Sequence, residues 1–299
     1  MKIAVFGNLT VDEIRSNGQA RLVPGGSALY VSAASAFLNA RVSLFSSIGQ
    51  DYPVETLKWL KGQGVDVSGV NRVKGPSTRF RLTYQNGSRK LRILQPGRKT
   101  RLDRIRGRWQ AVHFGPVYRE VEHRLIRSIC RQSDFVSLDI QGLIRTSARN
   151  GDVRLVPKRL EVLKMCDLVK ASQVEARVQT SVKDPLDAAE GLLAQGAKNA
   201  IVTTGRRGAI LALRNGRRLK IPAYPEIDVV DRTGAGDGFV GSWLPIFLST
   251  GDPVWAASVG SAFASMMLKK HGPFKFRISR PELFRRSAWV YGRVKPLGG

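Results

Sequence analysis

The chain has 299 residues, of which 42% are hydrophobic and 24% are charged, the composition of an ordinary globular protein. Its length holds one large α/β domain or two smaller ones. Lys and Arg outnumber Asp and Glu by 49 to 23, which gives a formal net charge of +26. Because the basic residues are scattered, without an arginine-rich tail or an aromatic RNA-binding motif, the charge indicates a surface that attracts anions such as nucleotides rather than a dedicated nucleic-acid-binding protein.

Cysteine usage and apolar runs bear on the compartment. Cys130 and Cys166 lie far apart in the sequence and form no CxxC or metal-spaced pair, which fits a reduced cytosol. The apolar stretch after Lys2 is too short for a signal-peptide core, and the longest weakly polar run, 256–268, is too short for a membrane span. We therefore expect a cytoplasmic protein with no membrane partner.

Strands and helices alternate in the N-terminal part of the chain. Asn17-Gly18 is a strong hairpin signal between two short extended pieces, and Pro24-Gly25-Gly26 breaks the pattern after them. Such alternation predicts a mostly parallel sheet with helices on its faces. The elements expected here are a strand over 2–8, a helix over 27–39, a strand over 42–48 and a helix over 54–62.

A second hairpin is predicted where polar and apolar residues alternate over 78–84. The chain turns at Asn86-Gly87 and returns through Leu91, Ile93 and Gln95. Alternation on both arms indicates strands with one buried and one exposed face. We expect the segments 11–23 and 77–95 to form one small antiparallel β-lid beside the main domain.

The α/β alternation resumes at residue 111 and predicts a three-layer α/β/α fold. A hairpin over 209–221 turns at Asn215-Gly216, and Asp252-Pro253 supplies a cap and a first helical residue. Pro245 is expected to kink the helix that contains it. The remaining elements expected are strands over 111–115, 134–139, 167–170 and 199–204, and helices over 119–132, 158–164, 173–180, 185–195, 235–249 and 253–270.

The segment from Asp231 to Gly238 carries the clearest chemistry. The β-branched residues of 227–230 predict a strand that ends in a glycine-rich turn, and the apolar run after it predicts a helix. Free N–H groups and the positive helix end converge on an anion in such a turn. Asp237 falls in the first helical turn beside that anion, as phosphoryl transfer to a hydroxyl requires. The alternative is that Asp237 only favours the helix dipole.

Two signatures about two hundred residues apart give the chain a family resemblance. Asp231-Arg232-Thr233-Gly234-Ala235-Gly236-Asp237 and the pair Gly25-Gly26 before a small-residue helix resemble the signatures of the ribokinase-like (PfkB) carbohydrate kinases. The run Gly25-Gly26-Ser27-Ala28-Leu29-Tyr30 is most similar to archaeal-type inositol and nucleoside kinases. The resemblance covers essentially the whole chain. It implies one kinase domain over 1–299 with a lid, and a possible homodimer formed through the lid.

The resemblance implies catalytic roles for the second signature. Asp237 corresponds to the base that takes the proton from the acceptor hydroxyl. Gly234, Ala235 and Gly236 would supply N–H groups to the transferring phosphoryl group.

It also implies an acceptor site near the N-terminus. Asp12 corresponds to an aspartate that binds acceptor hydroxyls, and the alternative is a surface carboxylate in a short lid strand. Gly25 and Gly26 would let the backbone approach the acceptor, and the alternative is a plain helix-entry turn. Tyr30 replaces an Asn of many sugar kinases, so it would stack on a ring or donate one hydrogen bond.

Three further segments match the family less completely. Gln141 stands at an acceptor-site Asn position, and Arg145 would steady the donor phosphate, unless it is an ordinary solvated arginine. Glu175 would organise magnesium through water, although Ser172 and Glu175 also fit a capping box. Thr203, Gly205 and Gly208 resemble a nucleotide-binding loop, which a plain turn also explains. Arg232 is unusual within the signature, and we assign it no role.

These features predict a magnesium-dependent kinase that transfers the γ-phosphoryl of ATP to a hydroxyl of a sugar, polyol or nucleoside. Among acceptors the sequence favours a cyclitol such as myo-inositol, with a nucleoside as the alternative. Another class of protein stays open, a non-catalytic binder of a ligand or of nucleic acid. A steep salt dependence of DNA or RNA binding would support that class.

Overall fold

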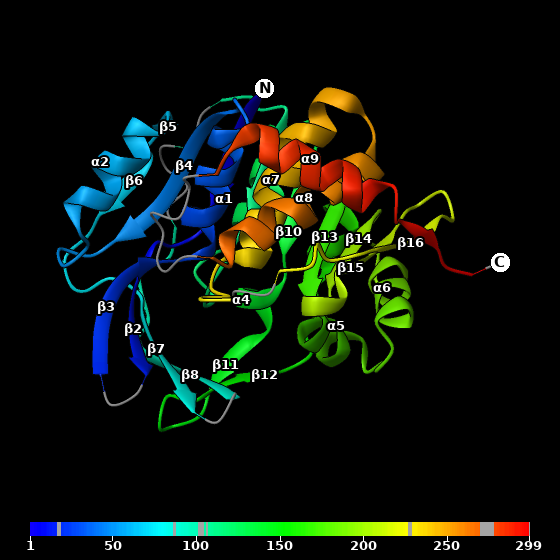
Figure 1. Ribbon diagram of the computed structural model, residues 1–299. Helices are drawn as coiled ribbons and strands as arrows, with labels where there is room; N and C mark the ends of the chain where they lie inside the picture. The colour runs from blue at the N-terminus through cyan, green and yellow to red at the C-terminus, as the bar shows by residue number, and fades with distance from the viewer. Residues whose placement is uncertain are drawn as a thin grey trace.

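The computed structural model describes residues 1–16, 19–85, 88–100, 105, 107–226, 229–269 and 278–298. Its main sheet has β6 beside β4 and the strand order β17-β16-β15-β14-β13-β10-β9-β1-β4-β5 (Figure 1). The strands from β14 to β4, with β5 and β6, pair in parallel, and β15 to β17 are antiparallel. The strands are β1 (Lys2–Phe6), β4 (Arg41–Ile48), β5 (Val65–Asp66), β6 (Val70–Arg72), β9 (Ala111–Phe114), β10 (Val136–Asp139), β13 (Leu168–Ser172), β14 (Ala200–Thr203), β15 (Ala209–Ala212), β16 (Arg218–Ile221) and β17 (Lys295–Pro296).

Helices cover both faces of this sheet, because its central strands are buried on both sides. One core unites the sheet with α1, α7, α8 and α9, and the other unites it with α3, α5 and α6. The mostly parallel sheet and the three-layer α/β/α arrangement are as predicted. The helices are α1 (Ser27–Phe37), α2 (Val54–Gly62), α3 (His123–Cys130), α4 (Gln141–Ile144), α5 (Gln173–Thr180), α6 (Pro185–Ala194), α7 (Ala235–Thr250), α8 (Pro253–Met267) and α9 (Arg280–Tyr291), with short 3₁₀ helices at Glu161–Met165 and Gly205–Arg207.

The lid is a second, smaller sheet with strand order β3-β2-β7-β8, drawn below the main sheet in Figure 1. Its two hairpins are antiparallel, as predicted, and a parallel pairing of β2 with β7 joins them. The predicted turns Asn17-Gly18 and Asn86-Gly87 lie outside the described residues. The strands are β2 (Thr10–Ser16), β3 (Gln19–Gly25), β7 (Arg79–Gln85) and β8 (Ser88–Gln95).

Several sequence predictions were wrong. β3 continues through Pro24 and Gly25, where a break was expected, because an edge strand tolerates proline. No strand leads into the signature at Val229 and Val230; residues 227–228 lie outside the described part. The N–H of Val230 instead donates to the Leu268 carbonyl at the end of α8. The helix predicted over 158–164 is only the short 3₁₀ turn.

The last third of the chain contains a helix, α9, that the sequence analysis missed. Its start carries a recognisable signal: the Ser279 side chain accepts a hydrogen bond from the Glu282 N–H, and Pro281 follows the cap. The helix predicted over 119–132 is shorter than expected, His123–Cys130. Two further strands, β11 (Arg145–Ser147) and β12 (Val153–Leu155), form a small hairpin that was not predicted.

Asn8, between β1 and β2, connects the lid to the main sheet. Its side-chain amide donates to Thr78 Oγ1 at 3.3 Å and to the Arg98 carbonyl at 2.8 Å, the residues that flank the β7–β8 hairpin. Its side-chain carbonyl accepts a hydrogen bond from the Ser47 N–H. A single buried side chain therefore connects both ends of one lid hairpin to the end of β4.

Candidate active site

The predicted signature forms the turn that begins α7. Gly234 is the N-cap with φ of 76°, a left-handed conformation that favours glycine. The Asp231 carboxylate accepts a hydrogen bond from the Thr233 N–H at 2.8 Å and so shapes the turn. The helix then starts at Ala235, which places Asp237 in its first turn. Local sequence thus creates a helix N-terminus with a carboxylate beside it.

Asp237 is positioned by a residue from the other end of the chain. The Ser27 hydroxyl, at the first position of α1, donates to Asp237 Oδ1 at 2.7 Å. This bond holds one carboxylate oxygen in place and leaves the other to interact elsewhere. The sequence analysis did not assign Ser27 a role, although it directly follows the glycine pair.

The side chain of Tyr30 packs against the same turn. A Cβ built on Gly234 would lie 2.6 Å from atoms of the Tyr30 ring, so the ring packs against Gly234. Tyr30 is only 2% exposed. Burial, followed by the nearby Asp12, Asp231 and Asp237, raises the pKa of its hydroxyl well above the usual value. The ring surface that was expected to stack on an acceptor is therefore used at least in part by the signature turn.

Asp12 lies in β2 and points toward the same region. It is 8% exposed, so the alternative of a surface carboxylate is wrong. A Cβ at Gly25 would overlap Asp12 Oδ2, and a Cβ at Gly26 would overlap the Asn8 carbonyl. The main role of the glycine pair is therefore to make room for Asp12 and for the chain between β1 and β2. Gly26 also lines the cavity described below.

A buried ion pair lies beneath the signature turn. Lys170 Nζ is 2.6 Å from Asp139 Oδ2, and both side chains are buried. Burial raises the pKa of Asp139 to about 6 despite this partner. Burial alone would lower the pKa of Lys170, but the carboxylates of Asp139, Asp237 and Glu175 raise it above its usual value. Lys170 was missed, although a lysine within the apolar run Leu168-Val169-Lys170-Ala171 is itself an unusual signal.

These side chains meet in one cavity of about 270 Å³. It lies at the carboxyl edge of the main sheet, because Ser172 and Thr203, which line it, are the last residues of their strands. Four of the predicted residues do not line it: Gly25, Ala235, Gly205 and Gly208. The predicted residues that do line it are Asp12, Gly26, Tyr30, Gln141, Arg145, Glu175, Thr203, Gly234, Gly236 and Asp237.

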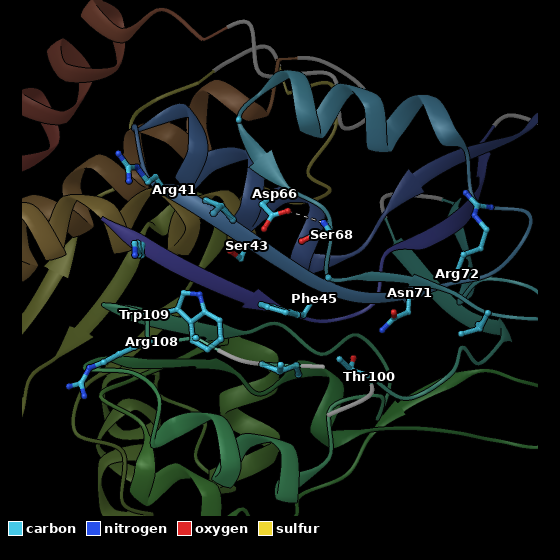
Figure 2. Close-up of a pocket in the computed structure, with 17 residues that line it drawn as sticks. Arg41, Ser43, Phe45, Asp66, Ser68, Asn71, Arg72, Thr100, Arg108 and Trp109 are labelled. Carbon is cyan, nitrogen blue, oxygen red and sulfur yellow. Dashed lines mark hydrogen bonds between the residues drawn. The ribbon is translucent and has the colours of Figure 1, made fainter. Parts of the chain in front are cut away.

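A larger cavity of about 730 Å³ extends along β4 and β6, from Lys2 and Arg41 at one end to Arg72 at the other (Figure 2). Its cations do not converge. Arg72 donates to backbone carbonyls such as that of Gln50, and Arg108 pairs with Asp134. Figure 2 shows Arg41 and Arg108 extending outward at one end and Arg72 at the other. The carboxylates and the buried lysine suited to catalysis therefore line the smaller cavity.

Residues 3–276 match the pfkB family of carbohydrate kinases. The chain belongs to this family. The predicted family and the predicted class of enzyme, a phosphotransferase with an alcohol group as acceptor, are thereby confirmed.

Relatives of this pfkB kinase act on different acceptors. It is 26% identical to the cytidine kinase of Thermococcus kodakarensis, over 93% of this chain and 100% of that protein. It is 25% identical to the deoxyribokinase of Salmonella typhi, over 91% of this chain and 94% of that protein. The fold also matches a pyrophosphate-dependent kinase of the ribokinase family, solved with a pyrophosphate analogue and myo-inositol, at a TM-score of 0.80 and 22% identity over 95% and 99% of the two chains.

Arg145 and Gln141 both line the cavity. The Arg145 guanidinium donates to the Val117 carbonyl at 3.0 Å and lies over the Phe80 ring at 5.8 Å. It is therefore anchored beside the lid, and it also lines the cavity and lowers the pKa of the Glu175 carboxyl. Gln141 begins α4, and its N–H donates to Asp139 Oδ1 at 3.0 Å.

Glu175 was expected to organise magnesium, with a capping box as the alternative. The structure contains this capping box. The Ser172 N–H donates to the Glu175 carboxylate at 2.7 Å, and the Ser172 hydroxyl accepts from the Glu175 N–H. Burial would raise the pKa of Glu175, but Lys170 and then Arg145 lower it below its usual value. Its carboxylate still lines the cavity, so capping and a second role are compatible.

The donor set fits a magnesium ion that arrives with a nucleotide. Within the described residues no group of three His, Cys, Asp or Glu side chains could hold a metal. Mg²⁺ commonly uses one or two carboxylates together with substrate phosphates and water, and Glu175 offers one carboxylate beside the signature turn. When bound, the ion would neutralise phosphate charge, and Glu175 would hold it through water.

The predicted nucleotide loop is a closed turn between β14 and β15. The Thr204 N–H donates to the Gly208 carbonyl at 2.7 Å, and a Cβ at Gly208 would overlap the Ile221 carbonyl. Gly208, with φ of 91°, is thus required both by packing and by its backbone conformation, whereas Gly205, with φ of 62°, has open space around it. Only Thr203 of this loop lines the cavity. No helix in the described part of the chain is long and apolar enough to cross a membrane.

Proposed function

We propose that this kinase transfers the γ-phosphoryl group of magnesium-ATP to a hydroxyl of a nucleoside. One observation carries the proposal: Asp12, the Asp237 carboxylate held by Ser27, and the signature turn share one cavity beneath the lid. Asp12 binds hydroxyls of the acceptor sugar, because a carboxylate accepts two O–H groups at once. Asp237 lies at the helix N-terminus where the transferring group is held.

In the chemical step, the acceptor hydroxyl loses its proton and receives the phosphoryl group. The acceptor hydroxyl gives its proton to Asp237 and forms a bond from its oxygen to the γ-phosphorus. The bond between that phosphorus and the bridging oxygen breaks, and its electrons leave with ADP. N–H groups of the turn from Gly234 to Gly236 stabilise the charge on the phosphoryl oxygens.

The walls of the cavity favour a nucleoside over a cyclitol. The apolar side chains of Phe80, Leu82, Leu91 and Val117 line it on the lid side. A flat base packs well against such a wall, whereas a cyclitol with a hydroxyl on every carbon loses hydrogen bonds to water there. Gln141, with a donor and an acceptor, is available to a base. The similarity to a cytidine kinase over 93% of this chain also supports this choice.

A cyclitol acceptor is the second candidate. Two solved structures with TM-scores of 0.80 and 0.79 are kinases of myo-inositol, and both are named as pyrophosphate-dependent. The sequence run that ends at Tyr30 favoured the same acceptor. The experiment must therefore vary the phosphoryl donor as well as the acceptor.

A donor-by-acceptor panel tests the proposal. Purified protein is incubated with magnesium and either ATP or pyrophosphate, with nucleosides, inositols, pentoses and hexoses as acceptors, and product formation is measured. We expect turnover with ATP and a nucleoside, lost in Asp237→Asn. Turnover restricted to inositols would favour the second candidate, and turnover restricted to pyrophosphate would overturn the ATP assignment. A folded protein with no turnover in any combination would refute both candidates.

A further inference from the structure

The position of Lys170 suggests more than a structural ion pair. Lys170 and Asp139 are direct neighbours across the parallel strands β13 and β10, and both side chains emerge at the carboxyl edge of the sheet. The ammonium group donates one hydrogen bond to Asp139 Oδ2 at 2.6 Å. An ammonium group has three hydrogens, so donors remain after this bond is made.

The ammonium group lies against the signature turn itself. A Cβ built on Gly236 would be 3.0 Å from Lys170 Nζ and 3.4 Å from its Cε. The absence of a side chain at Gly236 therefore leaves Nζ in direct reach of the turn that holds the phosphoryl group. Lys170 lines the same cavity as Asp237 and Glu175.

The carboxylates that line the cavity favour a cation close to the signature turn. Asp237 and Glu175 both face the position of an incoming phosphoryl group and repel its negative charge. Arg145 lies over Phe80 on the lid side, and Arg232 is exposed to solvent. Among the described cations that line the cavity, Lys170 is the buried one, at 5% exposure. A buried cation acts more strongly on developing charge than a solvated one.

We propose that Lys170 is a further catalytic residue of this kinase, whose ammonium group donates to the transferring phosphoryl oxygens while Asp139 fixes its position. This inference rests on the proposed phosphoryl transfer, with either donor. Lys170 stays protonated throughout; it forms and breaks no covalent bond and compensates the charge that moves from the donor to the leaving group. Asp139 is then a positioning residue that acts through Lys170.

A purely structural ion pair predicts something different. Removing one partner of a buried pair leaves an unpaired charge and destabilises the protein, whatever the function of the pair. Removing both charges relieves that penalty. The double variant Lys170→Met/Asp139→Asn therefore separates the two interpretations, because the amide introduced by Asp139→Asn keeps an oxygen for the Gln141 N–H.

The experiment compares wild type, Lys170→Met, Asp139→Asn and the double variant in thermal unfolding, in kcat and KM, and in pyrophosphate binding by calorimetry. Lys198→Met is a control for loss of a lysine from an ion pair outside the cavity, because the half-exposed Lys198 pairs with Asp167 at 2.7 Å. We expect the double variant to recover stability relative to Lys170→Met. We also expect it to lose about 100-fold or more in kcat, with acceptor KM changed less than about threefold. Pyrophosphate affinity should fall about tenfold, as expected for the loss of one charge-assisted donor.

A stable double variant with kcat near that of wild type would overturn the inference. Pyrophosphate binding distinguishes this failure from failure of the proposed function, since it requires no turnover. If wild type turns over no acceptor but binds pyrophosphate more tightly than the double variant, the transfer reaction is refuted while the phosphate contact of Lys170 is supported. Equal affinity, or no binding by wild type, overturns the contact.

Discussion

The ring of Tyr30 packs against Gly234, so that α1 and the turn that begins α7 are in direct contact. A Cβ at position 234 would lie 2.6 Å from the ring, and the backbone φ there is 76°. The signature glycine is thus required both by its own conformation and by a residue about two hundred positions earlier in the chain. Substitutions at the two positions should not be independent.

We expect Gly234→Ala to lower the free energy of unfolding by about 2–4 kcal/mol, from overpacking together with backbone strain. Combining it with Tyr30→Leu should restore part of this loss, because the smaller side chain relieves the overlap but not the strain. Chemical denaturation of both single variants and the double variant measures the coupling. Strictly additive effects would contradict a direct contact.

Ser27→Ala should reduce kcat about tenfold, because the variant loses the 2.7 Å hydrogen bond that fixes Asp237. Kinetic assays in the wild-type and Asp237→Asn backgrounds measure this. In the Asp237→Asn background the same substitution should have little further effect, since the base is already lost. Ser35→Ala is a matched control, because the Ser35 hydroxyl bonds to the Gly241 carbonyl away from the cavity. An equal loss in both backgrounds would mean that Ser27 acts independently of Asp237.

Stability should depend on pH through His113. This side chain is completely buried, its Nδ1 lies 3.0 Å from Ser137 Oγ, and burial followed by Lys170 lowers its pKa to about 3. The unfolded chain binds a proton near pH 6.5, whereas the folded protein does not. The stabilising contribution is therefore complete above about pH 6.5 and is lost as the pH falls from there toward 3.

Between about pH 7 and pH 5 this loss should amount to about 2 kcal/mol. The variant His113→Gln, which cannot titrate, should show a flatter profile by that amount when unfolding by urea is compared at the two pH values. Any contribution of Asp139 is common to both proteins and cancels in the difference. Parallel profiles for wild type and variant would contradict the burial of a neutral histidine.

Glu175→Gln should raise the magnesium concentration needed for half-maximal activity, because the carboxylate that would hold the ion through water is replaced by a neutral amide. Gln can still complete the capping box with Ser172, so the thermal unfolding temperature should change little. Magnesium titrations of activity at saturating donor provide the measurement. An unchanged magnesium titration with a reduced kcat would mean that Glu175 caps α5 and contributes to the local charge, but does not hold magnesium.

The sequence predicted elements well where local signals decide them. The capping box of Ser172 and Glu175 begins α5, which spans Gln173–Thr180 as expected. The resemblance of the two signatures also implied one common site, and Gly26, Gly234, Gly236 and Asp237 line one cavity. α9 was missed although Ser279 and Pro281 mark its start.

Other features depend on contacts between distant segments, which no local pattern reports. Gly25 resembles a residue that admits the acceptor, and only the fold shows that Asp12 occupies the space beside it. Lys170 stands out in the sequence as one charge among apolar neighbours. Its pairing with Asp139 and its approach to Gly236 required the register of β10 and β13. The contact between Tyr30 and Gly234 is of the same kind.

The parallel pairing of β2 with β7 bears on how the protein folds. Each lid hairpin closes over a short stretch of chain and can form early, whereas the seam between Ile14 and Leu82 joins segments separated by the whole β4–β6 region. In the folded protein, β1 and β4 pair in parallel and Asn8 bonds to Thr78, so we expect this seam to form after these strands have paired. We therefore expect the lid sheet to be among the last parts of the protein to form, so that a nascent chain covers its candidate site only after the main sheet has begun to assemble.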